Sequence, residues 1–150
     1  LKKGDLIIIE STSPIGTTEK MQKLIFSSRP ELEGAIYIAY CPERVLPGNI
    51  MYELVMNDRV IGGIDEVSTQ KALSFYKKFV KGDLHITNAR TAEMCKLVEN
   101  SSRDSQIAFA NELSILCDKF KIDVYKLIHS LMHVVAVTTC EQMLFGEEFC

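Results

Sequence analysis

The first 87 residues alternate short apolar runs with amphipathic stretches, and this alternation restricts the fold more than any other feature of the sequence. The runs are LIIIE (6–10), AIYIAY (35–40), DRVIGG (58–63) and LHIT (84–87). Short runs rich in β-branched residues are typical of strands buried on both faces. Strands that alternate with helices form a mostly parallel sheet through right-handed crossovers. We therefore predict an α/β fold.

Capping residues mark the helices between these strands. Thr17 or Thr18 is predicted to cap a helix after the first strand, and Asp65 to cap a helix after the third. The apolar face of the first of these helices is expected to consist of Met21, Leu24 and Ile25. A helix therefore follows each of these strands, as the alternating pattern requires.

A change of character follows the fourth strand, because residues 88–120 contain neither glycine nor proline. Asn88 can cap a helix that continues to about Phe120, and Asp123 a further short helix. At 1.5 Å per residue the long helix extends roughly 50 Å. Such a helix usually bridges domains or packs against a partner chain. We predict a domain boundary near residue 87.

Composition excludes several classes of function. The chain has 150 residues, of which 47% are hydrophobic and 25% charged, so it can bury one core and we expect a globular protein. A net charge of −3 without a clustered basic stripe argues against nucleic acid or an anionic membrane as partner. Neither a membrane-spanning run nor a signal peptide is found, so we expect a cytoplasmic protein.

The cysteines and histidines give no metal signature. Five cysteines form an odd set without a CxxC spacing, so we expect reduced and mostly buried thiols. His129 and His133 are four residues apart, as metal ligands on a helix are, but no HExxH accompanies them. We predict no metal site.

Charged residues follow the second strand directly, in the stretch CPERVLPG (41–48). In open α/β sheets, ligands bind in the crevice beyond the carboxyl ends of the strands. Glu43 is therefore a candidate for chemistry in such a crevice. The alternative is a solvated turn.

One face of the long helix carries a second candidate group. Glu93, Lys96, Asn100 and Arg103 are three or four residues apart, which places them on one face. Lys96 and Asn100 can donate together to one oxygen, as the stabilisation of an alkoxide or oxyanion requires. The alternative is a solvated charged stripe.

Four stretches together resemble the UDP-glucose/GDP-mannose dehydrogenase family, and within it the UDP-N-acetyl-D-mannosamine 6-dehydrogenase branch. They are ESTSPIGT (10–17), CPERVLPG, NDRVIGG (57–63) and AEMCKLVENSSRDSQIAFANELSILC (92–117). Each is weak alone, but their order and spacing are specific. The resemblance covers about residues 1–128.

This resemblance implies a fragment of an NAD-dependent enzyme that oxidises UDP-N-acetylmannosamine, or a related UDP-sugar, to the uronate. The reaction would use two NAD and pass through a cysteine thioester. Residues 1–87 would be the C-terminal part of a Rossmann-like NAD-binding domain. Residues 88–150 would begin a helical central domain that forms a homodimer through the long helix, with a sequence that diverges after about residue 129.

The same resemblance implies a role for each motif residue. Glu43 and Thr12 would hold the water that hydrolyses the thioester, with Glu43 as base. Lys96 and Asn100 would stabilise the oxyanion. Ser11 and Thr12 would contact the nicotinamide side of the cofactor. The substrate would be bound by Glu43, Arg44, Val45, Leu46, Lys96 and Asn100.

The chain also departs from the family pattern. It contains no GxGxxG, and none of its cysteines lies in the GGxC context of the family's nucleophile. Cys140 is nearest to the expected region, but we do not assign the role to it. Lys121 stands where the family often has glycine at a helix end. We therefore expect the chain not to be active alone.

Two other functions are compatible with the pattern. The β-hydroxyacid and 6-phosphogluconate dehydrogenases also place a lysine and an asparagine four residues apart on a helix after a Rossmann domain. A non-catalytic assembly module would use only the long helix. Structural roles are also open for each residue: Thr12 in a turn, Glu43 paired with Arg44 or Arg59, and Lys96 paired with Glu93 or Glu99.

Overall fold

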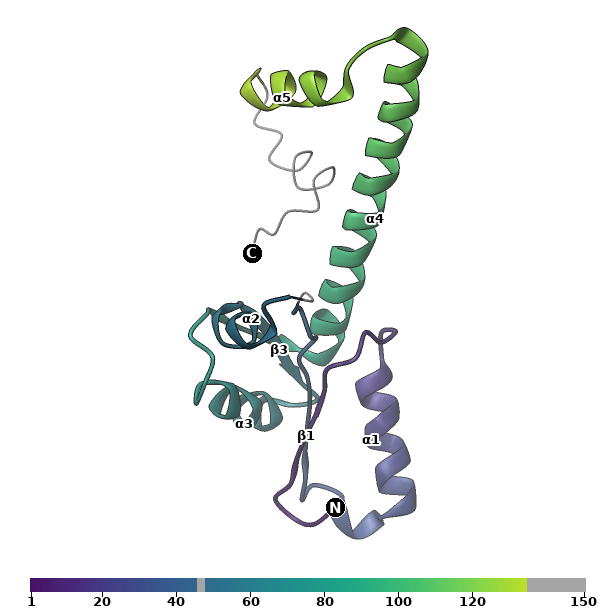
Figure 1. Ribbon diagram of the computed structural model, residues 1–150. Coiled ribbons are helices and arrows are strands. Elements are labelled where there is room, and N and C mark those ends of the chain that lie inside the picture. The colour runs from purple at the N-terminus through teal and green to yellow at the C-terminus, as the bar shows by residue number, and fades with distance from the viewer. Residues whose placement is uncertain (46–47, 135–150) are drawn as a thin grey trace. The chain divides into compact units, whose positions relative to one another are not determined.

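The computed structural model describes residues 1–45 and 48–134, the last four without their side chains (Figure 1). The chain divides into two compact units, of which the first comprises residues 1–98 and the second begins at residue 99. The first unit contains the whole sheet, and it holds most of the residues predicted for the site.

The order of elements follows the predicted alternation. All four predicted strands are present, each within about two residues of its expected bounds. A short helix and a turn of 3-10 helix were not predicted. The elements are β1 (Leu6–Ile9), α1 (Thr17–Ser28), η1 (Pro30–Leu32), β2 (Tyr37–Tyr40), α2 (Ile50–Met56), β3 (Arg59–Gly63), α3 (Glu66–Tyr76), β4 (Leu84–Asn88), α4 (Ala89–Phe120) and α5 (Val124–Val134).

The four strands form one sheet in the order β1-β2-β3-β4. β1 pairs with β2 in parallel, and β3 pairs with β4 in parallel. The central ladder is antiparallel, with Ala39 opposite Gly63 and Tyr40 opposite Gly62. The predicted mostly parallel sheet is confirmed, with one reversal between its two halves.

Helices cover both faces of the sheet (Figure 1). On one face α1 packs through Ile25 and Phe26 against a cluster that includes Ile38. On the other face α3 packs through Ala72 and Tyr76. Alternate residues of β2 face opposite sides, because the side chains of a strand have a period of two. The sheet is therefore the middle layer of three.

The predicted apolar face of α1 is partly wrong. Ile25 packs in the core as expected. Leu24 is 61% exposed and Met21 37% exposed. Phe26 takes the place expected for them. The error has a simple cause: α1 lies with Ile25 and Phe26 toward the sheet, and a two-residue contact of that kind leaves no clear helical period in the sequence.

Gly62 lets the chain pass closely over β3 where β4 becomes α4. A Cβ atom on Gly62 would lie 2.2 Å from the carbonyl oxygen of Asn88 and 2.8 Å from the nitrogen of Ala89. Real Cβ atoms do not approach backbone that closely. The absence of a side chain at Gly62 is therefore what allows α4 to begin against the sheet.

Side chains cap the helices as predicted at three positions. Asp65 Oδ1 accepts from Ser68 N at 2.6 Å, and Asn88 Oδ1 accepts from Thr91 N at 2.9 Å. Asp123 Oδ1 accepts from the nitrogen of Tyr125 at 3.0 Å. These bonds satisfy amide groups that have no partner within the helix.

The end of α4 keeps the geometry that a glycine usually provides. Lys121 has φ 59, in the left-handed region. Ile122 N donates to Cys117 O at 2.9 Å, and Lys121 N to Asp118 O at 3.2 Å, which is the Schellman pattern. The lysine therefore strains the backbone locally but does not abolish the cap.

Over the described part of the chain, no helix combines the length and apolarity needed to cross a membrane.

Candidate active site

The loop that leaves β1 is fixed through its backbone while its side chains stay exposed. The carbonyl oxygen of Ser11 accepts from the Tyr40 hydroxyl at 3.1 Å and from Ser13 Oγ at 2.9 Å. Ser13 and Tyr40 are buried, whereas the side chains of Ser11 and Thr12 are exposed. We call residues 10–16 the β1 loop. Its two candidate residues are thus available to a ligand.

The segment that leaves β2 runs beside the β1 loop. Cys41 N donates to Ile9 O at 3.0 Å, and Glu43 N donates to Glu10 O at 3.0 Å. These bonds extend the parallel pairing of β1 and β2 past the ends of both strands. The candidate base is therefore held beside the β1 loop at the carboxyl ends of the two strands.

Glu43 is half-buried, and its carboxylate is held by its own loop. Glu43 Oε1 accepts from Arg44 N at 2.7 Å and from Val45 N at 2.8 Å. Two amide donors to one carboxylate oxygen fix the orientation of the group. Leu46, also predicted to bind substrate, lies outside the described residues.

Arg59 and Tyr76, which are both buried, form a polar cluster with the exposed Glu10 at the end of β1. The Tyr76 hydroxyl donates to Glu10 Oε1 at 2.6 Å, and the Arg59 guanidinium carbon lies 5.1 Å from the centre of the Tyr76 ring. Arg59 also donates to Leu54 O at 3.1 Å. Burial raises the pKa of Tyr76, and the hydrogen bond to Glu10 adds to the effect. Arg59 is thus engaged with α2 and α3.

Cys41 is unsuited to act as a nucleophile. It is fully buried, and burial raises the pKa of its thiol. A nucleophilic cysteine requires the thiolate, which this environment disfavours. The thiol of Cys117 is also buried, whereas that of Cys95 is exposed. Cys140 and Cys150 lie outside the described residues.

The first turns of α4 contain a carboxylate that caps another helix. Glu93 is fully buried. It accepts from Gly16 N at 2.5 Å, from Thr18 N at 2.8 Å and from Thr18 Oγ1 at 2.7 Å. The prediction that Thr17 or Thr18 caps α1 is wrong: Gly16 is the N-cap residue, and no side chain of the α1 segment supplies the cap. Glu93, expected on a charged face, supplies it instead.

An ion pair joins the same two helices at the surface. Arg90 Nε donates to Glu19 Oε1 at 2.6 Å, and Arg90 Nη2 donates to Glu19 Oε2 at 2.8 Å. The hydrogen bond from Arg90 lowers the pKa of the Glu19 carboxyl. Both groups are exposed, so solvent screens the pair and it contributes little to stability.

Lys96 and Asn100 are on successive turns of α4, and both are half-buried. Within residues 1–45 and 48–134, neither side chain forms a hydrogen bond or an ion pair. The carboxylate of Glu93, which Lys96 was considered able to pair with, is occupied by α1. No hydrogen bond in that part of the chain joins Lys96 to Thr12 or Glu43, so their convergence on one substrate stays a prediction.

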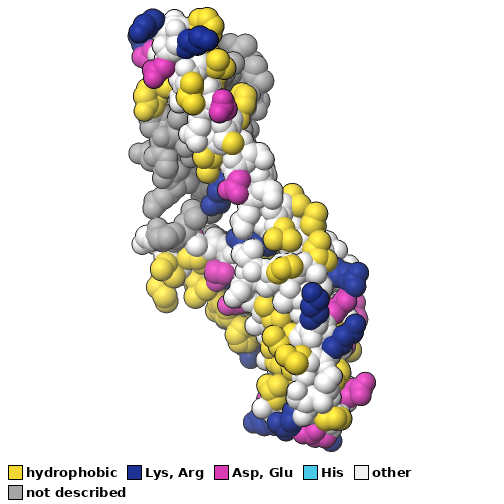
Figure 2. All heavy atoms as spheres, turned by 90° about the vertical axis from the view of Figure 1, so that its right-hand side faces the viewer, with side chains coloured by type: hydrophobic (Ala, Val, Ile, Leu, Met, Phe, Trp, Pro, Cys, Tyr) yellow, Lys and Arg dark blue, Asp and Glu magenta, His cyan; other side chains and the backbone are white. Residues whose placement is uncertain are grey.

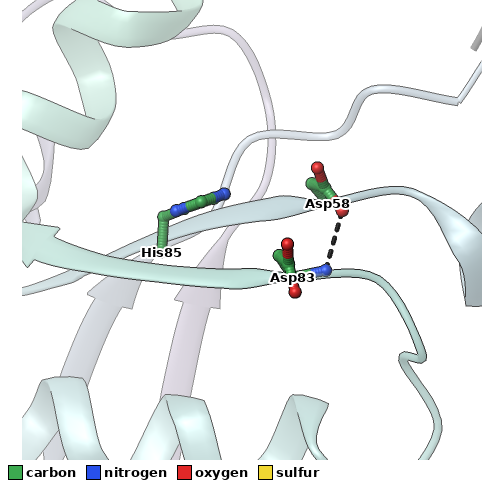
Figure 3. Close-up of side chains that lie close together, drawn as sticks. All are labelled: Asp58, Asp83 and His85. Atoms are coloured by element: carbon green, nitrogen blue, oxygen red, sulfur yellow. Dashed lines mark hydrogen bonds between the residues drawn. The ribbon is translucent and has the colours of Figure 1, made fainter.

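A group of possible metal ligands was missed by sequence reasoning (Figure 3). One ligand atom each of Asp58, Asp83 and His85 lies within 4.8 Å of the others, and all three residues are exposed. Asp58 Oδ1 accepts from Asp83 N at 2.7 Å, which ties the entrances of β3 and β4 together. Asp58 is 25 residues from Asp83, so no motif spacing could have indicated the group. The bond to Asp83 N gives Asp58 a structural role.

An apolar hollow opens on the outer side of the α1 and α4 junction. Figure 2 shows hydrophobic side chains gathered on this face of the first unit. The hollow has a volume of about 490 Å³ and is lined by Ile15, Arg90, Thr91, Met94, Cys95 and Val98. Few polar groups line it, so it is a surface for packing and not for chemistry.

Sequence comparison assigns the two parts of the chain to one family. Residues 1–80 match the UDP-glucose/GDP-mannose dehydrogenase family, NAD binding domain, and residues 90–137 match the central domain of that family. A sheet covered by helices on both faces, with candidate residues beyond the carboxyl ends of two strands, is the frame of a dinucleotide-dependent dehydrogenase. The chain belongs to the UDP-glucose/GDP-mannose dehydrogenase family, and its cofactor is NAD.

Individual relatives narrow the comparison. The chain is 57% identical to a UDP-N-acetyl-D-mannosamine dehydrogenase of Yersinia pestis and 54% identical to that of Escherichia coli strain K12, over 85% of this chain and 32% of each relative. The structure of UDP-D-ManNAc dehydrogenase from Pyrococcus horikoshii matches with a TM-score of 0.83 and 45% identity, over 91% of this chain and 33% of that one. The resemblance predicted from the motifs is confirmed. The chain spans about a third of the length of these relatives.

Proposed function

We propose that this chain belongs to an NAD-dependent dehydrogenase that oxidises UDP-N-acetylmannosamine, or a closely related UDP-sugar, to the uronate. The observation that carries the proposal is the pairing of the segments that leave β1 and β2, which holds Glu43 beside the β1 loop. The identity to UDP-N-acetyl-D-mannosamine dehydrogenases supports the choice of sugar. Residues 1–87 would serve the NAD-binding domain, and residues 88–150 would begin the central domain.

The residues present fit the nicotinamide side of an NAD site. Ser11 and Thr12 are exposed at the carboxyl end of β1, where dinucleotides bind in folds of this type. Tyr40 and Ser13 hold the loop backbone through the Ser11 carbonyl oxygen. The side chains of Ser11 and Thr12 are therefore positioned while remaining available to a ligand. NAD supplies the hydride acceptor when bound. We assign Ser11 and Thr12 to its binding.

The remaining roles follow from charge and position. Glu43, oriented by its own loop, would take a proton from the water that hydrolyses a thioester, with Thr12 holding that water. Lys96 and Asn100 would donate to the oxygen on the carbon being oxidised. Arg44, Val45 and Leu46 would contact the sugar nucleotide. No cysteine of residues 1–134 is assigned as the nucleophile.

The overall reaction is a four-electron oxidation. The alcohol carbon would give up two hydrides in turn, and two NAD would be the acceptors. The oxygen of one water enters the carboxylate, and three protons are released. In the proposed scheme a cysteine thioester separates the second hydride transfer from the hydrolysis, which is the step assigned to Glu43.

The full-length protein tests this proposal directly. We expect it to form two NADH for each UDP-N-acetylmannosamine consumed, followed by absorbance at 340 nm and by mass spectrometry of the uronate. UDP-glucose, UDP-galactose and a 3-hydroxyacid serve as competing substrates. Preference for another UDP-sugar would change the assigned substrate, and oxidation of the hydroxyacid alone would favour the other dehydrogenase class. Absence of NADH with every substrate would overturn the enzymatic function.

We also propose that α4 pairs with a second copy of the chain. Phe109 is 60% exposed and Leu116 51% exposed. They are seven residues apart, so they lie on one stripe of the helix. Exposed apolar stripes of this kind favour association.

Sedimentation of the full-length protein tests the pairing. We expect a dimer that the Leu116→Asp substitution converts to monomer, because a charge on the stripe would be buried without a partner. Asn111→Asp adds the same charge at an exposed polar position of α4 and should leave the dimer unchanged. A monomeric wild-type protein, or a dimer that tolerates Leu116→Asp, would contradict the proposal.

A further inference from the structure

Glu93 differs in exposure from the other charged residues of α4. It is fully buried, whereas the remaining acidic and basic side chains of the helix are partly or fully exposed. Burying a carboxylate is costly unless hydrogen bonds compensate for the lost water. The function proposed above assigns no role to this residue. Its burial therefore calls for a reason of its own.

Three donors from the start of α1 compensate the buried carboxylate. Gly16 N donates to Oε2, while Thr18 N and Thr18 Oγ1 donate to Oε1. The first amide groups of a helix have no partner within the helix, and the helix dipole favours negative charge there. Glu93 thus acts as the cap of a helix that begins 76 positions earlier in the chain. The contact is a buried tie between α4 and the end of the β1 loop.

The tie joins two segments that carry proposed catalytic groups. Lys96 follows Glu93 by three residues, which is less than one turn of α4. Thr12 precedes Gly16 by four residues in the β1 loop. We infer that Glu93 is a positioning residue, which holds the start of α4, and with it Lys96, in a fixed place relative to the β1 loop. This inference rests on the proposed function of Lys96 and Thr12.

The β1 loop is held from a second side as well. The Tyr40 hydroxyl of β2 donates to the Ser11 carbonyl, next to Thr12. Burial raises the pKa of Tyr40, and the nearby negative charge of Glu93 acts in the same direction, so the hydroxyl stays a donor. A loop fixed from β2 at Ser11 and from α4 at Gly16 has little freedom between those points. Thr12 lies within that interval.

Positioning of this kind affects turnover more than affinity. A displacement of about 1 Å between reacting groups can lower a rate about 100-fold. Glu93→Gln preserves the size of the side chain and an oxygen for Thr18, but it turns an amide donor toward Gly16 N. The substitution therefore breaks one bond of the tie and removes its charge without leaving a cavity.

The experiment measures kcat and KM of the full-length protein, per titrated active site. Glu93→Gln should lower kcat about 20-fold while KM for the UDP-sugar changes less than about 3-fold. Thr18→Val replaces the hydroxyl with a methyl group and should lower kcat about 3-fold. Thr18→Ser keeps the hydroxyl and should keep the wild-type kcat. Glu19→Gln, which breaks the exposed pair with Arg90 at the same junction, is the matched control and should leave kcat unchanged.

A double-mutant cycle separates positioning from a general effect on stability. If Glu93 acts by placing Lys96, Glu93→Gln should have little further effect on kcat in a protein that already carries Lys96→Ala. A purely structural role predicts a lower melting temperature, unchanged kcat per active site, and full additivity. The pH dependence of kcat should keep its shape in Glu93→Gln, because a positioning residue transfers no proton. Additive losses or a lost limb of the pH profile would overturn the inference.

Hydrogen exchange gives a readout that does not depend on catalysis. The amides of Gly16 and Thr18 should exchange at least about 10-fold faster in Glu93→Gln than in the wild type, with β1 and β2 unaffected. Unchanged exchange at these two amides would overturn the tie even if kcat fell. A wild-type protein without UDP-sugar oxidation would overturn the proposed function instead, and the exchange rates would still decide whether Glu93 holds α1 and α4 together.

Discussion

Glu43→Gln should lower steady-state turnover of the full-length enzyme about 1000-fold, the middle of the range for loss of a general base. Glutamine retains the oxygen that accepts from Arg44 N and Val45 N, so the loop should keep its shape. It cannot take a proton from water. Because hydrolysis is the step assigned to Glu43, the first NADH molecules should still form rapidly.

Stopped-flow absorbance at 340 nm is the measurement. We expect a burst of NADH close to twice the enzyme concentration, because both hydride transfers precede hydrolysis, followed by slow turnover, and a covalent adduct in the mass spectrum of the quenched enzyme. Glu33→Gln makes the same chemical change at an exposed carboxylate and should behave as wild type. A slow first turnover without an adduct would place Glu43 in an earlier step. Normal steady-state turnover would remove it from the chemistry.

Lys96→Ala should lower kcat by roughly 100-fold, about 3 kcal/mol, with a much smaller change in KM. The physical reason is that an oxyanion donor acts where charge develops and not on the bound alcohol. The Lys96 side chain forms no hydrogen bond or ion pair within the described residues, so the substitution should lower the free energy of unfolding little. Lys119→Ala, at an exposed position of the same helix, is the control.

Substitution of Asn100 gives a second test of the role of Lys96. Asn100→Ala should also lower kcat, and the double variant should lose less than the sum of the two, since both groups would serve one oxygen. A role for Lys96 in a surface ion pair predicts nearly normal turnover and a stability change of about 1 kcal/mol at most. Normal turnover in Lys96→Ala would take α4 out of the proposed active site.

The strands and the long helix could be predicted because their signals are local. Apolar runs of four to six residues mark the strands, and the stretch 88–120 without glycine or proline marks α4. The reversal between β2 and β3 could not be predicted, since a buried strand has the same composition in either direction. The short helix α2 was missed because seven residues after a proline-containing loop hold less than two full turns of pattern.

The candidate site was predictable in part, for a related reason. Glu43 stands out because it follows a buried strand directly, and its place beside the β1 loop follows from the parallel pairing of β1 and β2. Glu93 was misread as part of a charged helix face because spacing alone does not reveal burial. Its hydrogen-bond partners, Gly16 and Thr18, follow β1 and are far from Glu93 in the sequence, so the fold alone brings them to that carboxylate.

Strands β3 and β4, which run antiparallel to β1 and β2, also determine the position of Lys96 along the direction of β1. Asn88, the last residue of β4, is level with Gly63, which is opposite Ala39, and Ala39 pairs with Ile8 in the middle of β1. Because β4 runs against β1, α4 begins level with the interior of β1, and Glu93 then reaches the residues that follow β1. A slip of one residue between β3 and β4 would shift this starting level by about 3.3 Å. The β3–β4 register therefore determines how far along β1 the proposed oxyanion donor, Lys96, is placed.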